Sequence, residues 1–246
     1  MIEKIRKNKK VNYFIMLVLT LLQLGMFIWF SCALSFIAIY IHLTCWSFLL
    51  STIYLLLAII CDTSKIIFSS EKLEKLNHYI RNSFSTIAFP YNFMITIGFW
   101  GISLIGIIFG AETFTKEGTT LPTFYIIFNL HLHLGITIIM FVELLLNERE
   151  DIKLSLLNII INTVLFIAYV IMIYILKYSL NINAYVFMEN MNFWVILIVC
   201  LFMLLMLAGS FFIFKSISNC INRQHIKDLS EVKETNDKKD DEILLT

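Results

Sequence analysis

The stretch TFYIIFNLHLHLGITIIMFVELLL, residues 123–146, decides the fold class of this chain. As a helix it is long enough to cross the ~30 Å hydrocarbon core of a bilayer. His133 lies deep inside it, and Asn129 precedes it by one helical turn. Burying a titratable imidazole among apolar side chains is unfavourable, so its presence in a membrane span indicates a functional site.

Similar apolar runs recur along almost the whole chain, of which 59% is hydrophobic. A soluble domain of 246 residues could not cover so much apolar surface. We therefore predict an all-α polytopic transmembrane bundle with about six spans. These spans are residues 13–35, 43–61, 84–109, 123–146, 156–176 and 193–214.

We expect one transmembrane domain over residues 1–218 and a charged tail over residues 219–246. The tail is nearly free of aromatic side chains, so its composition predicts disorder. Basic residues orient the spans because they remain in the cytoplasm. All 19 except Lys116 and Lys177 fall in the N-terminal segment, the second and fourth connections and the segment from Lys215 to Lys239, which places both termini in the cytoplasm.

Polar residues inside the spans form two stripes. In the second span Thr44, Ser51 and Asp62 share one helix face at about 100° per residue. In the fourth span a second stripe consists of Asn129, His133 and Thr137, at intervals of four residues. The two stripes can face each other inside a bundle, which would place hydroxyl groups near an imidazole.

No cofactor or metal is expected. His131 and His133 point about 200° apart on a helix, so they cannot both ligate one ion. The five cysteines lack the paired spacing of a zinc site or a disulfide framework. The short motifs of serine hydrolases, zinc proteases and nucleotide-binding proteins are absent, and a net charge of +1 gives no reason to expect nucleic acid.

Structural interpretations compete with functional ones at several of these positions. Hydroxyl side chains in membrane helices usually bond to their own backbone, so Thr44 and Ser51 taken alone are expected to be structural. The histidine in the fourth span could equally hydrogen-bond across helices and do nothing else. Asp62 and Glu143 end their spans on the cytoplasmic side, where we expect solvated carboxylates.

Blocks of short motifs in fixed order change this balance. They are HLT at 42–44 with Asp62, AFP at 88–90 with Trp100, NLHLH at 129–133 with Glu143, and YVFME at 185–189. Together they resemble the androgen-induced gene 1 and androgen-dependent TFPI-regulating protein family of six-span membrane proteins. The resemblance covers roughly residues 40–190, and its specificity lies in the spacing of the blocks.

The resemblance implies a hydrolase of fatty acid esters of hydroxy fatty acids, with Thr44 as the nucleophile and His133 as the histidine. A neutral imidazole suits this role, since a hydroxyl needs a nearby base to become nucleophilic. Asn129 would hold the imidazole tautomer, and the first amides of the helix that begins at Thr44 would form an oxyanion hole. Ser51 is the rival nucleophile. If Asp62 and Glu143 mark the same depth in the membrane, a count of about 1.5 Å per residue from each places Ser51 level with His133.

The expected partner is a lipid ester that enters the site from the bilayer, and no protein partner can be read from the sequence. The plasma membrane or the endoplasmic reticulum is the expected location. The competing hypothesis is a non-catalytic lipid-binding or regulatory membrane protein, in which the polar stripes only fix the packing of the helices.

Overall fold

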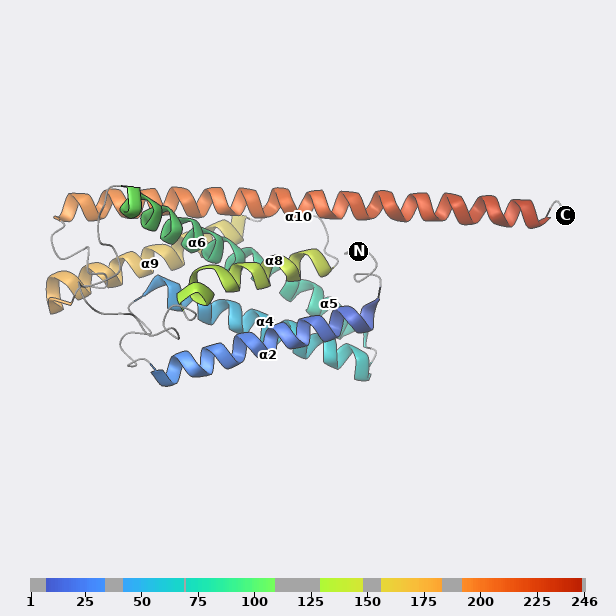
Figure 1. Cartoon of the computed structure of the whole chain (residues 1–246), viewed down its shortest axis with the longest axis horizontal. Coiled ribbons are helices and arrows are strands. Elements are labelled where there is room, and N and C mark those ends of the chain that lie inside the picture. Colours follow the sequence, from blue (N-terminus) through green and yellow to red (C-terminus); the bar gives the residue numbers. More distant parts are fainter. Residues whose placement is uncertain are drawn as a thin grey trace.

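The computed structural model describes residues 8–33, 42–68, 70–108, 129–147, 156–182 and 192–244, and at 102–108, 156 and 223–244 it describes the backbone alone. In these ranges all regular structure is helical, as the sequence predicts. The long helices are α2 (Lys9–Ala33), α4 (Leu43–Phe68), α6 (Ser85–Ile108), α8 (Ile136–Leu146), α9 (Leu156–Leu180) and α10 (Phe193–Leu244). They pack side by side as one bundle (Figure 1).

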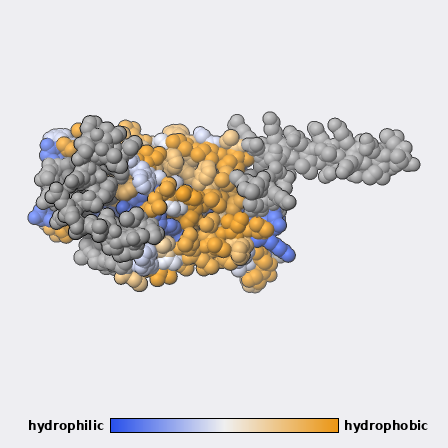
Figure 2. Space-filling model, viewed as in Figure 1, coloured by the Kyte–Doolittle hydropathy of each residue, from blue (hydrophilic) through white to orange (hydrophobic). Residues whose placement is uncertain are grey.

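Each predicted span coincides with a helix wherever the chain is described. Within the described ranges, four helices are long and apolar enough to cross a membrane, beginning at Lys9, Leu43, Leu157 and Phe193, and His131–Leu146 is a shorter apolar helix. Large apolar side chains are exposed along these helices, for example Leu205 on α10. Figure 2 shows the resulting broad apolar band across the middle of one face of the bundle. The chain is therefore an integral membrane protein.

The connection after the second predicted span is largely helical, which the prediction of spans alone does not indicate. α4 continues to Phe68, and α5 (Glu71–Tyr79) follows it after a short break. α5 is a short polar helix with Glu71 in its first turn and His78 in its last, an arrangement that complements the helix dipole. A π-helical turn, η1 (Ile80–Phe84), then leads directly into α6.

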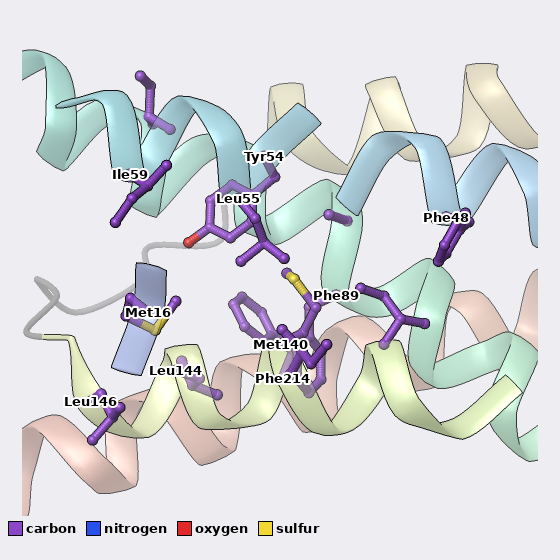
Figure 3. Close-up of a cluster of buried hydrophobic side chains, with 14 of the residues drawn as sticks. Met16, Phe48, Tyr54, Leu55, Ile59, Phe89, Met140, Leu144, Leu146 and Phe214 are labelled. Carbon is purple, nitrogen blue, oxygen red and sulfur yellow. The ribbon is translucent and has the colours of Figure 1, made fainter. Parts of the chain in front are cut away.

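The core of the bundle surrounds α4. Phe48, Tyr54 and Leu55 of α4 meet Phe89 of α6 and Phe214 of α10, all essentially inaccessible to solvent (Figure 3). A second cluster joins α6 to α9 and α10 through residues such as Met94, Phe166 and Leu207. Apolar burial of this kind fixes the relative position of the helices, although the surrounding lipid is itself apolar.

Pro90 helps to join α6 to α9. Proline has no N–H group, so the carbonyl of Thr86 one turn earlier receives no helical hydrogen bond from it. Asn162 on α9 donates its side-chain Nδ2 to this Thr86 carbonyl at 3.2 Å. In return, the Tyr91 hydroxyl donates to the Asn162 carbonyl at 2.8 Å. The proline therefore creates an acceptor that a neighbouring helix uses.

The beginning of α2 and the C-terminal half of α10 lie at the same end of the bundle (Figure 1). This agrees with the prediction that both termini are on one side, and their cytoplasmic location stays a prediction. α10 runs on beyond the bundle as a helix to Leu244, whereas the composition of the tail predicts disorder. Its many Lys and Glu residues are good helix formers, which accounts for the difference. The domain boundary at residue 218 stays a prediction.

Candidate functional site

A π-helical turn, η2 (His131–Gly135), positions the two histidines at the start of the fourth span. His131 bonds through Nε2 to Gln23 Oε1 of α2 at 3.0 Å, and its ring meets Phe48 of α4 edge-on. His133 instead stacks on Phe99 of α6. The two imidazoles therefore face different helices, as the helical geometry predicts.

His133 has an aromatic environment. The ring centroids of His133 and Phe99 are 3.6 Å apart and the ring planes differ by 6°. The His133 Nδ1 atom is buried and has no hydrogen-bond partner among the described residues. Asn129, one turn earlier on the same helix, is therefore not bonded to this nitrogen, and its role in holding the tautomer stays a prediction.

His42, immediately before α4, is close enough to interact electrostatically with His133. Burial lowers the pKa of the His42 imidazole, which keeps it neutral at pH 7. Because Thr44 follows His42 by two residues, the beginning of α4 lies near His133. Thr44 and His133 are not hydrogen-bonded to each other in the described part of the chain.

The first turn of α4 is tied down at its backbone. Leu43 donates its N–H to the Tyr169 hydroxyl of α9 at 3.0 Å. The amides of Cys45 and Trp46 donate to the His42 carbonyl at 3.0 and 3.4 Å. We expect the first-turn amides to form an oxyanion hole, but these three already donate hydrogen bonds. The Thr44 amide takes part in none of these bonds.

Ser51, the rival nucleophile, belongs to a separate network. It is 0% exposed and donates its hydroxyl to the Ser47 carbonyl at 2.8 Å. Asn92 of α6 donates Nδ2 to the Ser51 hydroxyl, and its Oδ1 accepts a bond from Ser47. These contacts give Ser51 a structural role between α4 and α6. The Thr44 hydroxyl, in contrast, makes no hydrogen bond with any described residue.

A second buried network connects α2, α4 and η2. Gln23 is 0% exposed and donates Nε2 to the Thr52 hydroxyl at 3.0 Å, while its Oε1 faces His131. Thr52 in turn donates to the Phe48 carbonyl at 2.8 Å. Every polar atom of the Gln23 amide group thus has a partner from another helix, which fixes His131 in place.

Members of both predicted polar stripes have partners on α6. Thr137 of the fourth span shares a hydrogen bond with Thr96 at 2.7 Å, and Ser51 of the α4 stripe accepts a hydrogen bond from Asn92. The reason is that α6 packs against both α4 and α8 and carries polar residues of its own.

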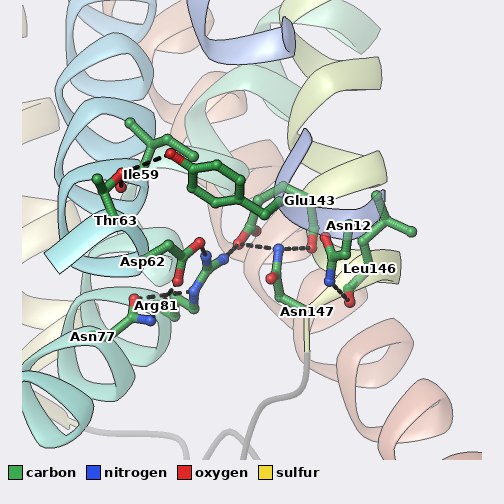
Figure 4. A network of polar contacts seen from close by, with 10 residues as sticks. Asn12, Ile59, Asp62, Thr63, Asn77, Arg81, Glu143, Leu146 and Asn147 are labelled. Carbon is green, nitrogen blue, oxygen red and sulfur yellow. Dashed lines mark hydrogen bonds and ion pairs between the residues drawn. The ribbon is translucent and has the colours of Figure 1, made fainter. Parts of the chain in front are cut away.

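The expectation of solvated carboxylates at Asp62 and Glu143 is wrong. Arg81 at the start of η1 is 5% exposed and binds Asp62 Oδ2 at 2.5 Å with one guanidinium nitrogen and Glu143 Oε1 with another. Glu143 is 0% exposed. Asn77 donates to Asp62 Oδ1 at 2.7 Å and accepts from Arg81 Nε at 3.1 Å. We call Asp62, Asn77, Arg81 and Glu143 the Arg81 cluster (Figure 4).

Sequence reasoning places Arg81 in a polar loop and gives no weight to Gln23 or Asn92. A side-chain amide within an apolar run is the signal that could have identified these last two.

A model of the FAR-17a/AIG1-like protein family matches residues 10–219, which include Thr44, Ser51, the Arg81 cluster and the histidines of η2. The YVFME block at 185–189 lies inside the match but outside the described residues. No curated protein matches the chain, and no solved structure does.

Proposed function

Because the chain belongs to the FAR-17a/AIG1-like family, we propose that it is a membrane-embedded hydrolase of lipid esters, of the class of fatty acid esters of hydroxy fatty acids. In this proposal Thr44 is the nucleophile and His133 is the general base. One observation supports it most directly. Thr44, whose hydroxyl has no described hydrogen-bond partner, follows by two residues His42, which interacts electrostatically with His133, and His133 has a buried nitrogen without a described partner.

The reaction would proceed in two acyl transfers. His133 accepts the hydroxyl proton of Thr44 as the Thr44 oxygen attacks the ester carbonyl carbon. His133 then gives this proton to the departing alkoxide, which leaves as the hydroxy fatty acid. A water molecule hydrolyses the threonine ester by the same route and releases the fatty acid. Hydrogen bonds between such groups are often absent before substrate binds and form in the complex.

The negative oxygen of the tetrahedral intermediate needs a hydrogen-bond donor. The amides of Leu43, Cys45 and Trp46 are engaged, so the Thr44 amide is the first-turn donor that the proposal uses. The ester would reach the site from the bilayer, because the surrounding helices expose apolar side chains to lipid. We propose the plasma membrane or the endoplasmic reticulum as its location.

The test is labelling of the purified protein in detergent with a fluorophosphonate probe, which reacts with activated hydroxyls. We expect the wild type and Ser51→Ala to be labelled, and Thr44→Ala and His133→Ala to lose labelling while remaining folded. Ser51→Ala is the matched control, since it removes a hydroxyl from the same face of α4. Loss of labelling in Ser51→Ala alone would move the nucleophile to Ser51.

No labelling of folded wild type would overturn the hydrolase proposal. That result would favour a non-catalytic lipid-binding or regulatory protein, in which the hydroxyls and histidines only join helices. A labelled protein should then be offered a fatty acid ester of a hydroxy fatty acid and, for comparison, a simple triglyceride. Hydrolysis of the triglyceride alone would keep the mechanism and change the substrate class.

A further inference from the structure

The stack between His133 and Phe99 has an unusual geometry. Neutral aromatic rings prefer offset or edge-to-face contacts with centroids roughly 4.5–7 Å apart. Here the centroids are 3.6 Å apart and the planes are within 6° of parallel, so the rings lie directly face to face. The electron-rich faces of two neutral rings repel each other in this arrangement, whereas a cation over the same face is attracted.

His133 has no described acidic partner. The carboxylates of Asp62 and Glu143 are bound to Arg81, and those of Glu71 and Glu74 pair with lysines on or near α5. The neighbouring titratable group that acts on His133 is another histidine, His42. A histidine that accepts a proton in this environment therefore gains a positive charge without a carboxylate to balance it in the described part of the chain.

We propose that Phe99 is a positioning residue for the reaction, which holds the His133 ring and stabilises its protonated form through the face of the phenyl ring. This inference rests on the proposed function. The cation–aromatic attraction exists only once His133 has taken the Thr44 proton, so it lowers the barrier without tightening the binding of substrate. In a catalytic triad an acidic third residue orients the histidine and stabilises its protonated form. Phe99 thus takes over part of this role.

The experiment compares Phe99→Leu, which removes the ring, with Phe99→Tyr, which keeps it. Phe93→Leu is the matched control, because Phe93 lies on α6 and stacks on Phe89 at 6.0 Å instead of on a histidine. We expect Phe99→Leu to label roughly 10-fold more slowly than wild type, in line with a desolvated cation–aromatic contact. Phe99→Tyr and Phe93→Leu should stay within about twofold of wild type.

Two further measurements separate this role from a merely structural one. With an ester substrate, Phe99→Leu should lower kcat and leave KM unchanged, because the contact forms in the transition state. In a His133→Ala background, Phe99→Leu should have no additional effect on the residual rate. Equal effects of Phe99→Leu and Phe99→Tyr, or a raised KM with unchanged kcat, would overturn the role of Phe99 while wild-type labelling upholds the hydrolase. Absence of wild-type labelling would overturn both proposals together.

Discussion

The charged guanidinium group of Arg81 is almost completely buried. At 5% exposure it has lost most of its hydration, and it is stabilised by two carboxylates and the Asn77 amide group. Glu143, one of these two carboxylates, is itself 0% exposed. Removing one member of such a group leaves its partner charged, buried and unpaired, and this is far more unfavourable than the loss of a surface ion pair.

We expect Arg81→Met to lower the free energy of unfolding by about 3–5 kcal/mol. Lys75→Met, which breaks the exposed pair with Glu71, should have an effect of about 1 kcal/mol or less. The measurement is unfolding of the purified protein by denaturant in detergent micelles. Combining Arg81→Met with Asp62→Asn and Glu143→Gln should restore much of the loss. If Arg81→Met and Lys75→Met have equal effects, the buried cluster does not stabilise the fold.

Tyr169 is a second residue whose removal has a defined effect. Its hydroxyl accepts the buried Leu43 N–H at the start of α4, one residue before Thr44. We expect Tyr169→Phe to destabilise the protein by about 1–3 kcal/mol, because that donor is left without a partner. Tyr178→Phe, at an exposed tyrosine of the same helix, is the control. Thermal unfolding measures the loss, and a shift no larger than that of Tyr178→Phe would contradict it.

At the scale of single elements, η2 depends on the absence of a side chain at Gly135. A Cβ atom at this position would lie 2.6 Å from His131 Nδ1, which is too close for any real contact. The imidazole is rigid and its other nitrogen is bound to Gln23, so it cannot move aside without losing that bond. π-helical turns within longer helices are frequently found at functional sites.

We expect Gly135→Ala to destabilise the protein, although alanine favours helices more than glycine does. Gly25→Ala, at an exposed position of α2 with nothing within 4 Å of the new Cβ, should be neutral or stabilising. In a His131→Ala background the penalty of Gly135→Ala should disappear. Thermal unfolding of the four variants forms a double-mutant cycle. A penalty that persists without His131 would show that Gly135 is needed for another reason.

The sequence predicts the long elements well, because a run of about 20 apolar residues signals a span without reference to any other part of the chain. η1, η2 and α5 are not predictable in this way. A π-helical turn results from packing, as between Gly135 and His131, and not from local propensity. The pairing of Arg81 with Glu143 joins residues from different elements, so no local pattern encodes it.

The features of the candidate site also divide into those that follow from local sequence and those that depend on packing. The opposite directions of His131 and His133 follow from helix geometry alone, and the structure confirms them. The use of Ser51 as a link to Asn92, and of Phe99 as a platform for His133, depends on how α6 packs against its neighbours. The roles of Thr44 and His133 in catalysis stay predictions, since they rest on the family resemblance and on proximity.

At the scale of the whole molecule, the first part of α10 packs in the bundle and the rest extends beyond it. Phe211 and Phe214 are buried in the bundle, and Ser218 and Asn222 continue this buried face. Beyond them the helix extends away from the other helices, at the end of the bundle where α2 begins (Figure 1). The extension should therefore contribute little to the stability of the membrane domain.

We expect deletion of residues 227–246 to leave thermal stability and probe labelling unchanged, because the α10 residues described as buried, up to Asn222, all remain. A chain that ends before Phe211 should fail to accumulate, since it lacks the α10 side chains that pack against α6. Expression level and the unfolding temperature in detergent compare the two truncations with the full chain. Loss of stability in the shorter deletion would show that the tail folds back on the bundle.

The position of Arg81 in the chain gives the cluster an order of assembly. Asp62 is synthesised 19 residues before Arg81, and Glu143 only 62 residues after it. The pair between the second and third spans therefore forms first, and its two formal charges already cancel. The fourth span then supplies the Glu143 carboxyl group, the second acceptor of the guanidinium. Until the fourth span arrives, one guanidinium nitrogen has yet to meet this acceptor, which distinguishes an unfinished protein from a finished one.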